Sequence, residues 1–442
     1  MSFVLLGILN SQAAGAGQAY FLSVLGGLSS EIGRGISFDS NGSIYIVGQT
    51  SQGAGTNYFL GKYAQNGTVD WQRTFGGGGD DLGRAITVDA SDDIYIQGRT
   101  ESTGQGGEDF AIAKYNSSGT ILWQRVLGGA FRDRGLSIAS DSANNIYAFG
   151  FTSSTVSFRQ EFLIVKYNSS GTIQWQRSLG SSAENYGYGI AVDGSDDIYV
   201  CGEHRTGAGV ADFIVAKYNS SGTIQWQRLL GGSGFQRALA IATDSANNVY
   251  ITGRTDSVGA GSSDNLLAKY NSSGTLQWQR VLGGASQDVC QAITIDSADN
   301  VYISGYSDST GAGNDDFLIA KYNSSGSIQW QRVLGGTDND ESFGIAVDSD
   351  DNIYAFGFAE GVRIAGIDDF FLAKLPNDGS LTGTYSLAGS SITYQSSSLT
   401  AATGTLSDSA ASETSGSISL VGATSTLTNT TVNLTVTTEE IG

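Results

Sequence analysis

The chain repeats itself with a period of about 52 residues, and this repeat constrains the fold more than any local motif. Phe21 stands one period before the first tryptophan, and the seven lysines from Lys62 to Lys374 follow the same spacing. So do seven aspartates from Asp39 to Asp348, each followed six positions later by a tyrosine. A fixed period of this length is the signature of a repeat architecture, so we expect seven copies of one structural unit. All six tryptophans stand on the period: Trp71, Trp123, Trp175, Trp226, Trp278 and Trp330.

One copy, residues 292–335, divides into four strands by its alternation of apolar and polar residues. The strands are AITID, NVYISGY, DFLIAKY and SIQWQRVLG, and the Asn, Asp, Ser and Gly residues after the first and the third are typical of tight hairpins. A four-stranded antiparallel unit cannot bury both of its faces alone, so the copies must stack. We therefore predict an all-β, seven-bladed β-propeller with the first strand of each blade next to the axis and the tryptophan strand outermost.

The two ends of the repeat predict how the ring closes. Residues 20–27 match a fourth strand without its first three, whereas the seventh copy has three strands and loses the pattern after Pro376. We expect residues 19–26 to supply the outer strand of blade seven. The chain then divides into an N-terminal segment (1–18), the propeller (19–375) and a C-terminal module (376–442).

The C-terminal module has its own composition. It contains no Lys, Arg or Trp after residue 376 and is rich in Ser, Thr, Gly and Ala. Residues 431–437 alternate between polar and apolar side chains, which predicts short, half-buried strands. With few large apolar groups the module makes a poor core by itself, so we expect it to pack on the propeller or on a neighbouring subunit.

The repeated phrases resemble a known family. KYNSSGSIQWQRVLGG (321–336), GIAVDS (344–349), DNVYISGYS (299–307) and DFLIAKYN (316–323) are similar to the SBBP group of β-propeller repeats, and the similarity covers residues 20–375. The resemblance implies the fold and no single function, since propellers serve as enzymes, adhesins and scaffolds. The N-terminal phrase MSFVLLGILNSQAAGAG resembles the starts of structural proteins of tailed marine bacteriophages, especially cyanophages, which implies a virion component.

Composition argues against several kinds of chemistry. A triad that needs histidine has only His204, and zinc would have only Cys201, Cys290 and His204 as soft or borderline ligands. We therefore expect no nucleophilic triad, no metal and no cofactor. The formal net charge of −20 repels nucleic-acid phosphate and anionic lipid headgroups. No apolar run reaches the roughly 18 residues of a membrane-spanning helix, so we expect no membrane insertion.

Four repeated polar features have structural explanations. Turns such as 296–300 suggest Ca²⁺ ligands, but they lack alternating D-x-D-x-D-G spacing and Asx turns account for them; calcium stays an open alternative. Asn-Ser-Ser recurs as a glycosylation sequon, yet its position favours a hairpin turn. Each repeated lysine ends a third strand, where we expect it to pair with an acidic side chain or a loop carbonyl. The arginines after each Trp-Gln pair, from Arg73 to Arg332, are predicted to be structural as well.

The loops predict where a ligand binds. Connections after the second and fourth strands run to about ten and eight residues, share one face and carry most differences among the copies. Binding residues tend to lie on loops held by a rigid scaffold, and aromatic and arginine side chains dominate binding energy; ordinary loop divergence is the alternative for each residue. His204, beside Glu203, is expected to be a surface histidine rather than a catalytic base. The candidates are Phe131, Arg132, Arg134, Phe158, Arg159, Tyr186, Tyr188, His204, Arg205, Phe235, Arg237, Arg254 and Arg363.

The N-terminal segment is the second candidate site. An export signal usually starts with a basic region, but the first basic residue here is Arg34. We expect the segment to dock into another subunit instead. The docking candidates are Phe3, Val4, Leu5, Leu6, Ile8 and Leu9.

Together these features predict a non-enzymatic virion protein on a phage tail or capsid surface. The N-terminal segment, and as an option the C-terminal module, would contact other virion subunits. The long-loop face would bind host glycan or protein, with weak contacts amplified by many copies. One alternative is a secreted or cell-surface bacterial adhesin or scaffold, with residues 1–17 as an export signal. The other is a carbohydrate-active hydrolase or lyase with acidic residues at the axial funnel, although the sequence nominates no carboxylate pair.

Overall fold

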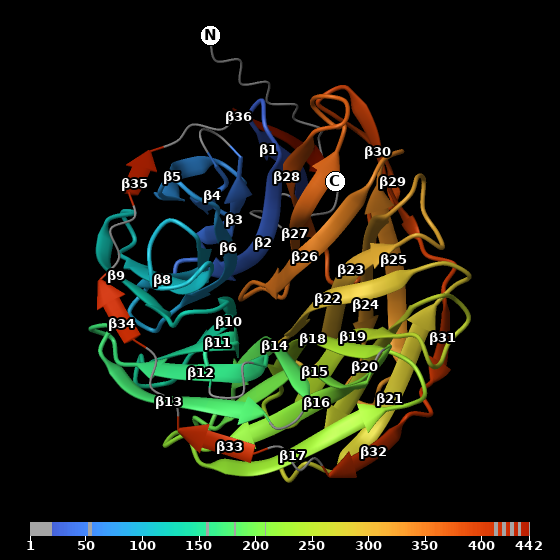
Figure 1. Cartoon of the computed structure of the whole chain (residues 1–442). Coiled ribbons are helices and arrows are strands. Elements are labelled where there is room, and N and C mark those ends of the chain that lie inside the picture. The colour runs from blue at the N-terminus through green and yellow to red at the C-terminus, as the bar shows by residue number, and fades with distance from the viewer. Residues whose placement is uncertain are drawn as a thin grey trace.

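The structure is a computed structural model that describes residues 20–51, 55–155, 159–180, 183–207, 209–410, 414–417, 421–424, 428–431 and 435–441. In these ranges the regular elements are β-strands, grouped into seven sheets that surround a common axis as the blades of a wheel (Figure 1). The predicted seven-bladed, all-β propeller is confirmed. None of the described residues belongs to a helix long and apolar enough to cross a bilayer.

Each blade has four antiparallel strands that follow one another from the axis to the rim. In blade seven the seventh repeat supplies only the first three of these strands. Blades one to three consist of β2 (Glu31–Phe38), β3 (Ile44–Thr50), β4 (Asn57–Tyr63), β5 (Val69–Gly76); β6 (Asp81–Val88), β7 (Ile94–Thr100), β8 (Asp109–Tyr115), β9 (Ile121–Gly128); and β10 (Asp133–Ser140), β11 (Ile146–Thr152), β12 (Glu161–Tyr167), β13 (Ile173–Gly180). Blades four to seven consist of β14 (Glu184–Val192), β15 (Ile198–Gly207), β16 (Val210–Tyr218), β17 (Ile224–Gly231); β18 (Gln236–Thr243), β19 (Val249–Thr255), β20 (Asp264–Tyr270), β21 (Leu276–Gly283); β22 (Asp288–Ile295), β23 (Val301–Ser307), β24 (Asp316–Tyr322), β25 (Ile328–Gly335); and β26 (Asp340–Val347), β27 (Ile353–Glu360), β28 (Asp368–Leu375).

The hydrophobic core lies between neighbouring blades. One cluster joins Val47 and Leu60 of blade one to Ile96 and Ala113 of blade two, and similar clusters fill the other gaps. Both faces of a blade are therefore covered, which is why β7 and β8 are buried along nearly their whole length. The apolar repeat is explained by this stacking, since no blade has a core of its own.

The strand β1 (Tyr20–Gly26) closes the ring. It pairs antiparallel with β28, with Phe21 opposite Lys374 and Leu25 opposite Phe370. Blade seven thus takes its fourth strand from the start of the propeller, as the incomplete first and seventh copies predict. Unfolding of either end removes a strand from the same sheet, so closure couples the two ends.

The C-terminal part adds two strands to the rim of blade six and one strand to the rim of each other blade (Figure 1). A hairpin of β29 (Gly383–Leu387) and β30 (Ser390–Ser396) extends blade six, and the chain then passes the blades in reverse order until it reaches blade seven. We call the segment from β30 to β36 the rim belt. The prediction that the tryptophan strand lies outermost is wrong, because the belt lies outside it. The remaining belt strands are β31 (Thr400–Thr403), β32 (Ser407–Ala410), β33 (Thr414–Ser417), β34 (Val421–Thr424), β35 (Thr428–Thr431) and β36 (Thr435–Ile441).

The belt advances by seven residues from one blade to the next. The last glycine of each fourth strand lies opposite belt positions spaced by seven: Gly335 with Thr393, Gly283 with Thr400, Gly231 with Ser407, Gly180 with Thr414, Gly128 with Val421, Gly76 with Thr428 and Gly26 with Thr435. Seven extended residues reach at most about 25 Å, so one heptad is the step between neighbouring blades. Because β36 pairs with β1, the first and last described strands lie side by side.

Two leucines anchor the described part of the belt. Leu399 and Leu406 are buried and pack into the cores between blades. The amide nitrogen Nε2 of Gln331 donates to the Leu399 carbonyl at 2.8 Å, and Nε2 of Gln279 donates to the Leu406 carbonyl at 2.8 Å. These glutamines are the repeated residues that follow tryptophan, so the 52-residue repeat contains the attachment point of the belt.

The face with the short turns is organised by the repeated aspartate. In blade six Asp296 Oδ1 accepts the backbone N–H of Ala298 (3.0 Å) and of Asn300 (2.8 Å), and Oδ2 accepts the Tyr302 hydroxyl (3.1 Å). Lys321 Nζ lies 3.6 Å from the carboxylate and 4.9 Å from the Tyr302 ring centroid. All seven repeated lysines pair with the aspartate of their own blade, which confirms their structural role.

The same turns join each blade to the next. Ser40 donates its backbone N–H and its hydroxyl to the carboxylate of Asp92 in blade two, at 2.8 and 2.7 Å. Where alanine or glycine replaces that serine, asparagine replaces the aspartate: the backbone N–H of Gly194 donates to Asn247 Oδ1 (3.2 Å), and Asn247 Nδ2 donates to the Ser195 hydroxyl (3.0 Å). The substitutions compensate each other, so the role of these residues is to hold blades together.

The tryptophans also act between blades. The indole N–H of Trp71 donates to the Ser117 carbonyl in the next blade at 3.1 Å. Gly119 lies over the same ring with a φ of +77°, and a Cβ there would stand 3.0 Å from ring atoms. Asn116 Oδ1 accepts the backbone N–H groups of Ser118 (3.1 Å) and Thr120 (3.0 Å), which confirms the turn expected for Asn-Ser-Ser.

Candidate functional site

The face opposite the short turns carries the longer connections, and we call it the long-loop face. Connections after the second strand, such as 101–108 and 308–315, have eight residues, and those after the fourth, such as 129–132, have four. Both are shorter than the ten and eight expected, because the strands extend beyond their apolar pattern. The chain contains sixteen arginines, and the ten that do not follow a Trp-Gln pair all lie in these loops or in the strand segments next to them.

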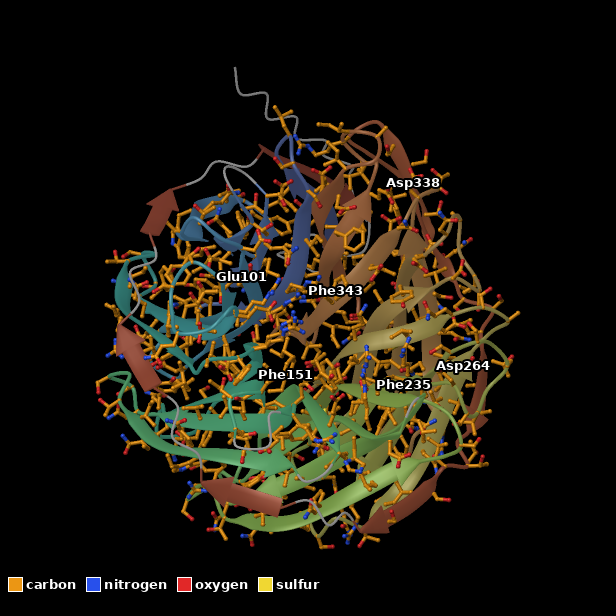
Figure 2. The ribbon with its side chains drawn as sticks, viewed as in Figure 1. Glu101, Phe151, Phe235, Asp264, Asp338 and Phe343 are labelled. Carbon is orange, nitrogen blue, oxygen red and sulfur yellow. The ribbon has the colours of Figure 1, made fainter. Side chains whose placement is uncertain are left out.

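Each inner strand has a β-bulge at the same place. In β10 the register with β11 shifts between Gly135 and Ser137, which makes Leu136 the extra residue. A bulge re-aims a side chain and is frequent beside functional sites. The seven extra residues line a cavity of about 200 Å³ on the axis, and Figure 2 shows Phe343 close to that axis. This bulge ring consists of Arg34, Arg84, Leu136, Tyr188, Leu239, Gln291 and Phe343.

The first cluster beside the cavity is centred on Glu108, which is almost fully buried. Arg134 binds its carboxylate through two nitrogens, Nε to Oε2 at 2.6 Å and Nη2 to Oε1 at 2.7 Å. Arg132 Nε lies 2.7 Å from Oε2, and Arg99 pairs with Oε1. One carboxylate therefore orients three arginines from blades two and three, and the cluster keeps an excess of positive charge.

The second cluster is centred on Glu203, which is fully buried in β15. Its carboxylate pairs with Arg205 and with Arg237, whose Nε lies 2.6 Å from Oε2. The guanidinium groups of Arg237 and Arg254 lie 5.1 and 5.0 Å from the ring centroid of Phe235. Figure 2 shows Phe235 and Phe151 on the same side of the wheel as Phe343, around the axis.

Aromatic rings connect the two clusters. Phe151 and Tyr186 meet edge to face with centroids 5.2 Å apart. Arg205 lies 4.5 Å from the Tyr186 centroid, and Arg134 lies 5.9 Å from that of Phe151. Tyr188 is in the bulge ring, where burial raises the pKa of its phenol to about 12 and the charge of Arg237 opposes this shift. Arginine and aromatic side chains thus alternate from blade two to blade five.

The bulge ring contributes two further cations on neighbouring blades. Burial and the nearby charge of Arg84 lower the pKa of Arg34 to about 9, although the carboxylate of Glu341 opposes the shift. Burial lowers the pKa of Arg84 to about 10, helped by the charges of Arg99 and Arg134. Both groups stay protonated at neutral pH, so the cavity mouth is positive in a chain whose net charge is −20.

Pairs of buried aspartates hold the long loops in place. Asp109 Oδ2 accepts the Gly106 N–H (3.1 Å), and Asp133 Oδ2 in the next blade accepts the Gly129 N–H (2.8 Å). In blade six Asp316 Oδ2 accepts the N–H of Ala312 (2.9 Å). Burial raises the pKa of Asp109 and of Asp316 to about 6, and the facing carboxylate of Asp133 adds to the shift of Asp109.

The predicted site residues have different fates. Tyr188 lines the cavity, and seven others belong to the two arginine clusters or contact them: Arg132, Arg134, Tyr186, Arg205, Phe235, Arg237 and Arg254. Phe131 and Arg159 are exposed on the loops, and Arg363 pairs with Asp369 at 3.0 Å in blade seven. Phe158 and the N-terminal residues Phe3 to Leu9 lie outside the described residues.

The expectation for His204 is wrong, because the side chain is buried and not on the surface. It stands opposite Asn185 in the sheet, and its Nδ1 lies 2.8 Å from Asn185 Oδ1. The loop pattern placed it among ligand-binding residues, but β15 extends to Gly207 and takes His204 into the blade. Its hydrogen bond to Asn185 gives it a structural role in blade four.

Sequence reasoning missed the residues that organise the site. Glu108 and Glu203 were hidden because a lone glutamate beside arginines predicts only a surface ion pair. Arg34, Arg84 and Phe343 lie within inner strands, and a bulge leaves no signal in the alternation except that one position varies among the copies. The repeats do contain that signal, since this position is Arg, Leu, Tyr, Gln or Phe while the residues on either side are always small (Gly, Ala, Ser or Cys).

The described residues contain no group of three or more His, Cys, Asp or Glu side chains arranged to hold a metal ion. The turn aspartates accept hydrogen bonds from the backbone and from tyrosine, as the Asx-turn explanation requires. Cys201 and Cys290 are buried and unpaired with each other.

Comparisons with known proteins support the propeller repeat. Residues 25–52 and 277–311 match the SBBP beta-propeller repeat, and residues 247–276 match the beta-propeller described as a domain of unknown function (DUF5122). The chain is similar to an uncharacterised WD repeat-containing protein of Acanthamoeba polyphaga mimivirus, with 25% identity over 40% of this chain. The match covers 17% of the length of that relative.

Two solved structures are similar to this chain at low identity. Polysaccharide lyase Uly1 is 10% identical with a TM-score of 0.49, over 78% of this chain and 90% of that one. Sqt1 from Chaetomium thermophilum is 10% identical with a TM-score of 0.45, over 84% of this chain and 97% of that one. Such similarity concerns the fold alone.

Proposed function

We propose that this chain is a non-enzymatic binding component of a virus particle and that its long-loop face recognises material on a host surface. The observation that carries the proposal is the separation of the cations. Ten arginines that break the repeat gather with unrepeated aromatic rings on one face, whereas the lysines hold turns on the other. Arginine and aromatic side chains supply most of the energy in binding surfaces.

The place of the protein in a particle rests on two similarities. One is the mimivirus WD repeat-containing protein, and the other is the resemblance of residues 1–17 to the starts of phage structural proteins. In this proposal the particle is a tailed phage, the N-terminal segment docks on a tail or capsid subunit, and the propeller projects outwards. Many copies on one particle would convert weak single contacts into firm attachment.

A pair of matched variants tests the long-loop face. Phe131 on this face and Leu122 on the rim are exposed by 47% and 49%, so truncating either one leaves the core intact. We expect Phe131→Ala combined with Arg132→Ala to weaken binding of the labelled full chain to host cells at least tenfold. Leu122→Ala should change it less than twofold. Equal binding by all three proteins would place recognition elsewhere.

The particle itself tests the location. Mass spectrometry of purified particles should detect this chain with the peptide that begins at Met1 intact. Recovery from the medium of a bacterial culture, with cleavage near Ala13 or Ala14, would instead support the secreted adhesin.

We propose no chemical reaction at the axial cavity. The carboxylates of Glu108 and Glu203 bind arginines, and His204 is bonded within its sheet, so these groups are engaged in structure rather than placed for proton transfer. Incubation with a panel of acidic polysaccharides should release no unsaturated or shortened products. Turnover that is lost in an Arg84→Leu variant would overturn the non-enzymatic assignment.

A further inference from the structure

Two arginines of the bulge ring are not held by an ion pair, although the carboxylate of Glu341 is near enough to Arg34 to raise its pKa. Arg134 and Arg237 donate to Glu108 and Glu203, but within the described part of the chain neither Arg34 nor Arg84 forms an ion pair or a side-chain hydrogen bond. The Nε of Arg34 is buried and has no hydrogen-bond partner. Cations that lose water without gaining a partner destabilise a fold, so their presence around a cavity indicates a ligand.

Arg34 and Arg84 are placed to bind the same charged group of a ligand. They occupy equivalent bulge positions in neighbouring blades and line the same cavity on the axis. The guanidinium carbon of Arg34 lies 3.9 Å from the Phe343 ring centroid, so the ring covers one face of the fork. The side-chain N–H groups of Arg34 form no hydrogen bond within the described part of the chain, and a planar fork of this kind matches the paired oxygens of a carboxylate or a sulfate.

The size of the cavity limits what enters it. Its volume of about 200 Å³ is below the range of roughly 300–1,000 Å³ that pockets for drug-sized ligands occupy. It admits one charged group with part of a sugar ring, and the rest of a longer ligand must lie outside. There it meets the arginines of the two clusters and the half-buried ring of Phe235, against which a sugar ring can pack (Figure 2).

The overall charge decides against a polyanion such as nucleic acid. A net charge of −20 repels a chain of phosphates, whereas a single group that enters a positive cavity avoids most of that repulsion. We propose that the cavity binds one carboxylate or sulfate group at the end of an acidic saccharide, with Arg34 and Arg84 donating hydrogen bonds to its oxygens. This inference rests on the proposed function and names the ligand class of the long-loop face.

The test uses substitutions that other blades already contain. Arg34→Gln introduces the residue of Gln291, and Arg84→Leu the residue of Leu136, so the inner strands should keep their fold. The control is Arg73→Gln, which removes the same charge far from the cavity, where Arg73 donates to the Gln72 carbonyl. Circular dichroism and the unfolding midpoint of each variant establish that it is folded.

Calorimetric titration of the full chain with defined ligands gives the outcome. The ligands are a uronic-acid oligosaccharide, a sulfated one, a neutral one of equal length, and inorganic sulfate. We expect the wild type to bind at least one acidic oligosaccharide and to ignore the neutral one. Each single substitution should weaken binding at least tenfold, the pair should abolish it, and Arg73→Gln should change it less than twofold.

Several results would overturn the inference. Wild-type affinity in the double variant would show that the cavity is not the site, and affinity for inorganic sulfate without any acidic oligosaccharide would remove the saccharide. If the wild type bound none of the ligands, the proposed site would also be rejected. Host-cell binding distinguishes the two proposals: if it depends on Phe131 and Arg132 but not on Arg34 and Arg84, only the cavity fails. If the cavity binds acidic saccharide while no cell surface is bound, only the proposed function fails.

Discussion

The two faces of the propeller treat their charged residues in opposite ways. On the short-turn face the same bonds recur in every blade, and hydrogen bonds from the backbone, Asn300 and Tyr302 outweigh burial and lower the pKa of Asp296. On the long-loop face burial dominates, and it raises the pKa of Asp109, of Asp316 and of Asp340. Charges that repeat are thus explained by contacts between blades. Charges that differ among copies are of two kinds: Arg134 and Arg237 are paired with buried glutamates, whereas Arg84 forms no ion pair, which our proposal explains by a ligand.

The largest expected effect concerns the rim belt, which joins blades independently of both faces. A chain that ends at Ser398 keeps the hairpin on blade six and loses β31 to β36. It loses the hydrogen bonds of six strand pairs, each bond contributing about 0.5–1.5 kcal/mol net, so we expect a loss of roughly 5 kcal/mol or more. Denaturant unfolding measures it, and size exclusion should detect association through the bared strand edges.

A shorter truncation grades this result. A chain that ends at Thr431 loses only β36, which pairs with β1. It should fall between the full chain and the chain that ends at Ser398. If all three proteins unfold at the same denaturant concentration, the belt does not stabilise the wheel and the two faces carry all cohesion.

The next effect breaks the short-turn face at one residue. Asp296→Ala removes the acceptor of two backbone N–H groups, of Tyr302 and of Lys321 in one buried cluster. We expect a loss of about 3 kcal/mol in unfolding free energy, because several donors stay buried without a partner. Asp338→Ala on the exposed part of the long-loop face is the control and should change stability by less than about 0.5 kcal/mol. Equal effects at both positions would contradict the division between the faces.

The 52-residue repeat made the propeller predictable, because a unit that cannot bury its own faces leaves few ways to pack. Closure through β1 followed from the incomplete copies. The belt was not predictable in the same way, although its period is visible: Leu399, Leu406, Leu420, Leu427, Leu434 and Ile441 stand at multiples of seven residues. A seven-residue step has no local meaning in a strand. Seven extended residues span the distance between neighbouring blades at the rim, and that distance is set only when the propeller has closed.

The site was predicted in outline and not in its organisation. Loop lengths pointed to the face that carries the cavity, and the structure places Arg134, Arg237 and Phe235 on that face; their role in binding stays a prediction. The cavity itself depends on the bulges that turn Arg34, Arg84 and Phe343 towards the axis, and a bulge depends on pairing between strands. Loop composition also failed for His204, since its burial depends on how far β15 extends.

The opposite pKa shifts predict how each face responds to pH. A lowered pKa, as for Asp296, gives stability that is present above about pH 4 and is lost as the pH falls through the folded value. A raised pKa, as for Asp316, gives stability that is complete below about pH 4 and is lost as the pH rises through about 6. Stability should therefore be highest near pH 4 and should fall as the pH rises towards 6.

One substitution separates the two contributions. Asp316→Asn keeps an oxygen for the Ala312 N–H and removes the charge, as Asn57 already does at the equivalent position in blade one. We expect it to stabilise the chain by about 1 kcal/mol at pH 7.5 and by nothing measurable at pH 4.5. Unfolding at both pH values measures this, with exposed Asp338→Asn as the control. A gain of equal size at both pH values would show that the charge is not the cause.

The smallest expected effect concerns Arg84, the arginine that we propose binds the ligand. Arg84→Leu removes a cation that has no partner in the described structure and lies beside the charges of Arg99 and Arg134. If Arg84 were structural, its loss would destabilise the fold, as for a buried residue with bonded partners. We expect the opposite, a gain of about 0.5–1 kcal/mol, because repulsion and desolvation are relieved while leucine already fills this position in blades three and five. The thermal unfolding midpoint should rise slightly in the same variant that no longer binds acidic saccharide, since an arginine that serves binding destabilises the protein when no ligand is present. A fall in the midpoint would show that Arg84 stabilises the fold, and its charge would then not be evidence for a ligand in the cavity.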